Sequence, residues 1–247
     1  MNETNQLISF DGRLSDSPYV EVIWRSQSER AGDFLSVAAS NWEMVITRLA
    51  GQIQLTVRGP ETEAKPAHCP ADGEWLGVVF KLGTYMPQWP TVDLVDGEVN
   101  LPEAGSRSFW LHGAAWEFPT YENVDTFIAK MVREGLLVHE PVVQAVLQNQ
   151  TTDLSLRSVQ RRFLHSTGLT YGAVSQIDRA RQAVSLLRQG VSILDTVELA
   201  GYADQPHLTR SLKRLVGQTP AQLLPHATPK EMSFVSMTGL AGVASPE

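Results

Sequence analysis

Short apolar runs rich in β-branched and aromatic residues recur through the first half of the chain, and clusters of Gly, Pro, Asp and Ser separate them. Runs of this length, bounded by turn-forming residues, are typical of β-strands. Regular short strands with turns between them favour a barrel or a sandwich. The strands predicted in this way are Tyr19–Trp24, Glu43–Leu49, Gln52–Arg58, Trp75–Lys81 and Arg107–Leu111.

The period of the apolar positions changes after Pro119. Apolar residues then recur every three or four positions, which is the period of a helix that is buried on one side. The helix at 156–167 is expected to bury Leu156, Val159, Phe163 and Leu164. The predicted helices are Val124–Arg133, Pro141–Leu147, Leu156–Thr167, Tyr171–Gln189, Ile193–Ala200 and Gln205–Val216.

Capping residues mark the ends of these helices. Ser155 and Asp204 stand where an N-cap side chain would accept a hydrogen bond from a free backbone N–H of the first turn. Gly168, Gly190 and Gly217 follow helices, in the position that favours a left-handed conformation.

The fold class predicted is α+β, a β-rich barrel-like or sandwich-like sensor domain followed by an all-α domain with two helix-turn-helix units. We expect a β-rich domain for effector binding or dimerisation at residues 1–120 and a linking helix at 121–140. A double helix-turn-helix domain is expected at 141–225, followed by a flexible tail at 226–247.

Charge is distributed unevenly along the chain, whose net charge is −7. Residues 1–154 hold 10 Lys and Arg against 21 Asp and Glu, whereas residues 155–214 hold 9 against 4. An acidic body with a basic module fits a DNA-binding protein that has a separate domain for another task. Charge alone does not separate this interpretation from that of a solvated helix face.

The segment Ile193–Leu212 has the pattern of a helix-turn-helix. Ala200 is small enough for two helices to cross closely, and Gly201 supplies the backbone freedom that the tight turn needs. Leu208 and Leu212 would anchor the second helix on the first. Side chains suited to base edges and phosphates then remain on the outside: Gln205, His207, Thr209 and Arg210.

The helix at 156–167 repeats this arrangement. Arg157, Gln160 and Arg161 share its outward side at spacings of three and four, and Arg162 is expected to reach a phosphate. Solvent exposure explains any one of these residues. It explains two outward faces of similar composition on two capped helices less well.

On these residues, the segment from about 142 to 223 resembles the DNA-binding domain of the AraC/XylS family of transcription regulators. The resemblance covers about a third of the chain. The matching stretches are Leu154–Phe163, Thr167–Thr170, Arg179–Arg181, Ala200–His207 and Gly217–Pro220.

The resemblance implies two helix-turn-helix units joined by a long helix, each of which places a recognition helix in the major groove of double-stranded DNA. It also implies an activator that contacts RNA polymerase, although repression stays open, and a homodimer formed through the acidic domain. Leucines replace the aromatic residues usual in the family at 208, 212, 215 and 223, Pro206 takes a position that is often polar, and the helix at 141–147 matches poorly.

Catalytic and metal-binding patterns were not found. His68 and Cys69 form the single suggestive pair, and a zinc site needs three or four ligands. Cys69 is interpreted as an ordinary loop cysteine, with a redox-sensing thiol as the alternative. Glycine-rich phosphate loops, a secretory signal and a membrane span are absent from the sequence. We therefore expect a cytoplasmic protein that is not an enzyme and has no cofactor or metal.

The first half matches the family's sensor domains only in general plan, so no effector-binding residue is assigned. Trp24, Trp42 and Trp75 could line a pocket for a small-molecule effector, but tryptophan in strands belongs more often to a core. An alternative is that this half is an enzyme-like barrel or a protein-interaction domain fused to a DNA-binding module.

Overall fold

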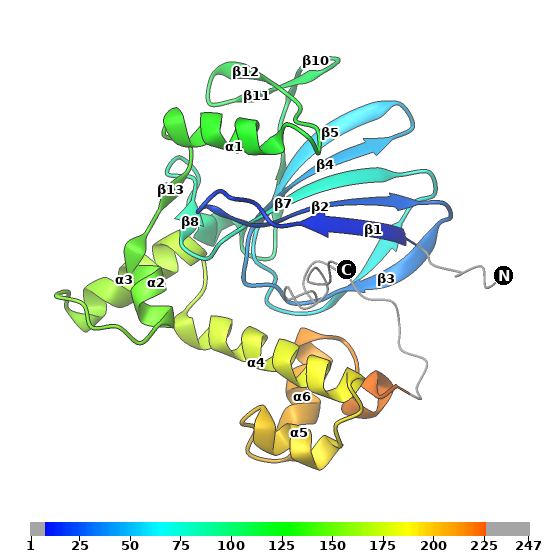
Figure 1. The fold of residues 1–247 in the computed structure, drawn as a ribbon, viewed down its shortest axis with the longest axis vertical. Helices are drawn as coiled ribbons and strands as arrows, with labels where there is room; N and C mark the ends of the chain where they lie inside the picture. Colours follow the sequence, from blue (N-terminus) through cyan, green and yellow to red (C-terminus); the bar gives the residue numbers. More distant parts are fainter. Residues whose placement is uncertain (1–7, 226–247) are drawn as a thin grey trace. The chain divides into compact units, whose positions relative to one another are not determined.

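The computed structural model describes residues 8–225, with strands β1 to β13, helices α1 to α6 and two short 3-10 helices, η1 and η2 (Figure 1). The tail predicted at 226–247 lies outside the described residues. No helix in the described range is both long enough and apolar enough to cross a membrane.

Six strands of the first half form one antiparallel sheet with the order β1-β2-β7-β4-β5-β9. The predictions for β4 and β5 are confirmed to the residue, and those for β2, β7 and β11 are confirmed with shifted ends. Strands β10, β11 and β12 form a second antiparallel sheet, and β8 pairs with β13. The strand bounds are β1 Ile8–Arg13, β2 Val20–Ser28, β3 Gly32–Ser36, β4 Glu43–Leu49, β5 Gln52–Arg58, β6 Lys65–Cys69, β7 Glu74–Phe80, β8 Thr84–Tyr85, β9 Glu98–Asn100, β10 Glu103–Gly105, β11 Ser108–Leu111, β12 Ala114–Glu117 and β13 Val138–His139.

A single hydrophobic core joins the large sheet to α1 (Val124–Arg133). Met44, Ile46 and Leu55 of the sheet are fully buried in it, and α1 contributes Ile128 and Met131. These alternating strand positions and the helical stripe meet because each element has one apolar face to remove from water.

The tryptophans proposed as core or pocket residues pack against other side chains. Trp42 stacks on Phe80 with ring centroids 3.9 Å apart, and it lies in the core. Trp24 is also buried, so close to Gly77 that the latter has no room for a Cβ. The prediction that tryptophan serves the core is confirmed for these two, whereas Trp75 is half-buried.

The described chain divides into two compact units that are not continuous in sequence. The first unit holds residues 8–32, 41–60 and 69–170, and therefore includes α1, α2 (Pro141–Leu147), α3 (Leu156–Thr167) and η1 (Thr91–Leu94). The second unit holds residues 33–40, 61–68 and 171–225, with α4 (Tyr171–Arg188), α5 (Ile193–Leu199), α6 (Gln205–Leu215) and η2 (Pro220–Leu223).

Two segments of the acidic half of the sequence belong to the second unit, and we call residues 33–40 and 61–68 the arm. Strands β3 and β6 pair with each other, and Ala39 forms a backbone bridge to Glu61. The arm also pairs with the end of α6, because Ala38 N donates to Leu215 O at 2.8 Å and Ala64 N donates to Arg214 O at 2.8 Å. Neither strand was predicted from the sequence.

Candidate nucleic-acid interface

The second helix-turn-helix consists of α5 and α6. Ala200 is buried at the crossing, Gly201 has φ of 68°, and Leu208 and Leu212 of α6 are fully buried. Asp204 begins α6 as its N-cap, because its Oδ1 accepts a hydrogen bond from His207 N at 2.6 Å. Ala200 at the crossing, Gly201 in the turn and Asp204 as the N-cap therefore have the structural roles that the sequence predicted.

Tyr202 fixes the turn between these helices. Its hydroxyl lies 3.1 Å from Ser211 Oγ, and the guanidinium of Arg179 lies 5.6 Å from its ring centroid. Arg179 also donates to Gly201 O at 3.4 Å. Burial raises the pKa of Tyr202, while the hydrogen bond to Ser211 and the charge of Arg179 act in the opposite direction. The turn is thus tied to both α4 and α6.

The predicted first helix-turn-helix corresponds to α2 and α3. Glu140 caps α2, accepting from Val142 N at 3.3 Å, and Ser155 caps α3, accepting from Ser158 N at 3.3 Å. The turn between the two helices, residues 148–154, is longer than the corresponding turn between α5 and α6. Phe163 and Thr167 provide the buried side of α3.

Helix α3 rests on η1 within the first unit. Thr91 Oγ1 donates to Ser166 O at 3.3 Å, and the ring of His165 meets that of Tyr85 with centroids 5.4 Å apart. Gly168 has φ of 74° and lies so close to Thr91 that a Cβ would stand 2.9 Å from the Thr91 carbonyl oxygen. A segment from the acidic half thus supports this helix directly.

A shift of 49 residues aligns the two capped helices with each other. It places the N-cap Ser155 on Asp204, the buried Phe163 on Leu212 and the left-handed Gly168 on Gly217. The same shift aligns Arg161 with Arg210, and both side chains are exposed. The protein therefore contains the same arrangement twice. In each copy, a capped helix carries an exposed arginine on the side opposite its buried residues.

Comparisons with known proteins match the part of the chain that contains both helices. A family model described as a helix-turn-helix domain matches residues 150–225. HTH-type transcriptional regulator RipA of Corynebacterium glutamicum is 35% identical over 88 residues, which are 35% of this chain and 27% of RipA. Residues 150–225 form an AraC-type helix-turn-helix domain.

The chain spans about a quarter of the length of RipA. The family match begins after α2, in agreement with the poor resemblance noted for residues 141–147. A solved structure of ToxT from Vibrio cholerae is similar over 89% of this chain and 99% of that chain, with 9% identity and a TM-score of 0.37.

The residues predicted to contact DNA do not all lie alike in the AraC-type domain. His207 and Thr209 are half-buried. The His207 ring packs edge-on against Tyr202 at 5.1 Å, and its Nδ1 accepts from Ala203 N at 3.5 Å. The remaining predicted residues are exposed on α3 and α6: Arg157, Gln160, Arg161, Gln205 and Arg210.

Arg162 has a partner inside the protein. Its Nη1 lies 3.6 Å from Oε1 of Glu140, the cap of α2, and its side chain is nearly half exposed. The prediction that Arg162 reaches a phosphate must therefore allow for this ion pair between α3 and the beginning of α2.

Lys213 is a further exposed cation on α6 that the sequence analysis did not name. It lies three residues after Arg210 and, like Arg210, is exposed on the side of α6 opposite the buried leucines. The spacing was available in the sequence as a signal. Arg214 is also exposed, and it donates to Gln176 Oε1 at 2.7 Å.

The expected buried stripe of α3 is wrong at two positions. Leu156 is 72% exposed and Leu164 is 39% exposed. The helix buries Phe163, as predicted, but Ser166 and Thr167 are the other buried residues. Both hydroxyls donate to carbonyl groups of the preceding turn, Ser166 to Arg162 O at 2.9 Å and Thr167 to Phe163 O at 2.8 Å, so their burial leaves neither hydroxyl without a partner.

His68 and Cys69 do not form one site. They are successive residues of β6, so their side chains point to opposite faces: His68 is exposed and Cys69 is buried. His68 Nδ1 lies 2.8 Å from Asp33 Oδ1. Among residues 8–225, no three His, Cys, Asp or Glu residues gather closely enough to hold a metal ion.

Proposed function

We propose that this protein is a sequence-specific DNA-binding transcription regulator that reads DNA with α3 and α6. The repetition of a capped helix with an exposed arginine, at a shift of 49 residues within an AraC-type domain, is the observation that carries the proposal. One such helix would be explained by solvation alone. Helices α3 and α6 share four features: an N-cap residue, a buried core position, a glycine after the C-terminus and an outward arginine. This agreement indicates that the two helices serve a common task.

Within this proposal, Arg161 and Arg210 reach base edges, because arginine can form two hydrogen bonds to guanine in the major groove. Gln160, Thr209 and Gln205 flank them and suit adenine or phosphate. Arg157 and Lys213 lie one turn away on the same exposed sides and supply the phosphate contacts that make binding depend on salt.

The test measures binding of the full chain to a labelled DNA fragment from upstream of its own gene, by fluorescence anisotropy at several salt concentrations. An unrelated fragment of equal length serves as the competitor. We expect Arg161→Ala and Arg210→Ala each to weaken specific binding by about five- to 150-fold, which is about 1–3 kcal/mol.

Arg133→Ala is the matched control, because it removes the same charge from an exposed position on α1. Equal loss of affinity for all DNA sequences would assign Arg210 to a phosphate. Unchanged affinity in the double variant Arg157→Ala, Arg161→Ala would reject reading by α3 and leave α6 as the reading helix.

The second part of the proposal is control of DNA binding by the acidic half, through a small effector or through dimerisation. Its support is that segments of this half pack directly on both helix-turn-helix units. Thr91 of η1 bonds to the end of α3, and the arm bonds to the end of α6. A change in these segments can therefore alter how either recognition helix is held.

Sedimentation of the full chain with and without DNA distinguishes the two modes of control. A monomer whose DNA affinity changes on adding a small molecule supports an effector, and a stable dimer supports control by dimerisation. DNA affinity that responds to neither would favour the alternative, in which the acidic half is a protein-interaction domain.

A further inference from the structure

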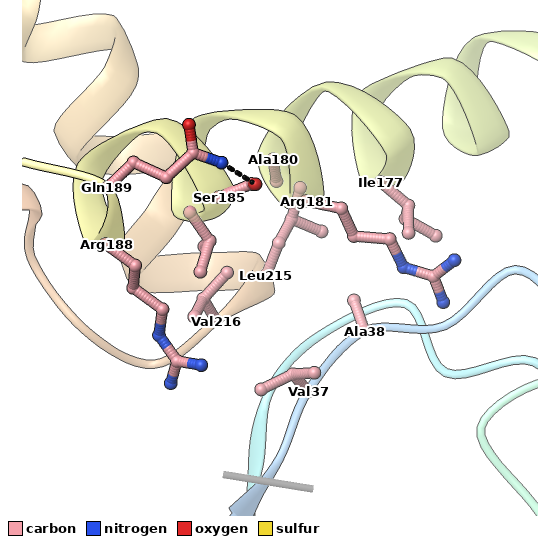
Figure 2. A pocket seen from close by; sticks show the side chains of 11 residues that line it. Val37, Ala38, Ile177, Ala180, Arg181, Ser185, Arg188, Gln189, Leu215 and Val216 are labelled. Carbon is pink, nitrogen blue, oxygen red and sulfur yellow. Dashed lines mark hydrogen bonds between the residues drawn. The ribbon is translucent and has the colours of Figure 1, made fainter. Parts of the chain in front are cut away.

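A pocket of about 250 Å³ lies wholly within the second unit, between α4, the arm and the end of α6 (Figure 2). Its apolar wall comes from Ile177 and Val184 of α4, Val37 and Ala38 of the arm, and Leu215 and Val216 at the end of α6. All six of these side chains are buried.

Two arginines of α4 line the same pocket. Arg181 and Arg188 are seven residues apart, so they lie on one side of the helix, about 10 Å apart along its axis. Figure 2 shows both side chains extending from α4 on the side where Val37 and Ala38 lie. A cavity with an apolar wall and two cationic side chains in its lining has the composition of a binding site for a small amphipathic anion.

The two arginines differ in whether a nearby carboxylate of the protein neutralises their charge. Burial raises the pKa of Asp178, and the charge of Arg181 one turn away lowers it, so Arg181 is partly neutralised by this carboxylate. Burial lowers the pKa of Arg188, and no carboxylate of the described chain offsets it. The guanidinium of Arg188 makes no hydrogen bond or ion pair with any of residues 8–225.

We propose that this pocket binds a small organic monoanion, with the carboxylate held by Arg188 and an apolar body against Val184 and Val37. At about 30 Å³ for each water molecule displaced, the volume admits about eight or nine non-hydrogen atoms. Charge-assisted hydrogen bonds from a planar guanidinium favour a carboxylate over a neutral amide of the same shape.

Such a ligand would contact the arm, α4 and the end of the second recognition helix together. Ala38 lines the pocket and also donates its backbone N–H to Leu215 of α6. The bound anion therefore holds the arm on α6. This consequence rests on the proposed function and makes the pocket an effector site, whereas the binding itself does not depend on DNA.

The experiment is isothermal titration of the full chain, without DNA, with cyclohexanecarboxylate and with cyclohexanecarboxamide. We expect the carboxylate to bind one site with Kd at or below about 1 mM, and the amide to bind at least about tenfold more weakly. Arg188→Gln should weaken carboxylate binding by about tenfold or more, and Arg133→Gln, on the first unit, should leave it unchanged.

Circular dichroism of each variant confirms that it is folded. Absence of carboxylate binding, equal affinity for carboxylate and amide, or equal losses in the two arginine variants would each overturn the inference. Because the titration contains no DNA, its failure leaves the DNA-binding proposal standing. Failure of the anisotropy assay, in turn, leaves the anion site standing.

Discussion

Replacing Gly168 and Gly201 by alanine separates backbone strain from steric contact. Both glycines have left-handed backbones, with φ of 74° and 68°. A Cβ on Gly201 would meet nothing within 4 Å, whereas a Cβ on Gly168 would stand 2.9 Å from Thr91 O and 2.9 Å from Val95 Cγ2. The two substitutions therefore share the strain and differ in the clash of α3 with η1.

The expected magnitudes follow from these two contributions. A left-handed alanine costs about 1–2 kcal/mol, and the lower entropy of its unfolded chain returns about 0.4–1 kcal/mol. Gly201→Ala should therefore lower the free energy of unfolding by about 0.5–1.5 kcal/mol. Gly168→Ala adds an overpacking cost of about 1–3 kcal/mol, because the nearest atom is backbone and cannot rotate away, for a total of about 1.5–4.5 kcal/mol.

Urea unfolding of the full chain measures both changes, followed by far-ultraviolet circular dichroism and by tryptophan fluorescence. All six tryptophans lie in the unit that contains Gly168, so fluorescence reports on that substitution and circular dichroism on both. Asparagine tolerates the left-handed region, so Gly201→Asn should be nearly neutral while Gly168→Asn stays costly. Equal losses for Gly168→Ala and Gly201→Ala would refute the seating of α3 on η1.

Other substitutions test a helix cap, the core and a half-buried histidine. Asp204→Ala should lower helix stability by about 1 kcal/mol in thermal unfolding, with Asp204→Asn restoring most of it; no loss in the alanine variant would deny the cap. Leu212→Ala should cost about 2–5 kcal/mol in urea unfolding, since the side chain is fully buried, and a cost below 1 kcal/mol would mean that α6 does not pack as described. Burial lowers the pKa of His139 below 6.5, so the unfolded chain binds its proton more readily, and stability should be complete above about pH 6.5 and fall as the pH drops below it. His139→Gln should flatten that part of the pH profile, and an unchanged profile would assign the dependence to other groups.

The helices could be predicted nearly to the residue because their signals are local. Ser155 and Asp204 cap the helices that follow them, and Gly168 ends α3 in a left-handed conformation. Each signal acts within one or two helical turns, so neighbouring residues contain it. The longer strands β4 and β5 were found for the same reason, since their apolar runs and their connecting turn are contiguous.

The short strands β3, β6, β8 and β13 could not be predicted, because each pairs with a strand that is distant in sequence. Strand β3 pairs with β6, and β13 pairs with β8. No local sequence pattern indicates which distant segment each of these strands will pair with. The exposure of Leu156 was missed for a related reason. Apolar residues predict a buried stripe, but the position of η1 decides that Ser166 and Thr167 occupy it.

The sequence by itself determined that the C-terminal part holds two capped helices with basic outward faces, because caps, helical period and charge are properties of neighbouring residues. Only the tertiary structure decided what supports these helices. Packing across long separations brings η1 to α3 and the arm to α6, and it closes a pocket beside Arg188 from three segments of the second unit. Contacts of this kind depend on how apolar surfaces that are far apart in the sequence fit together, so local sequence patterns cannot predict them.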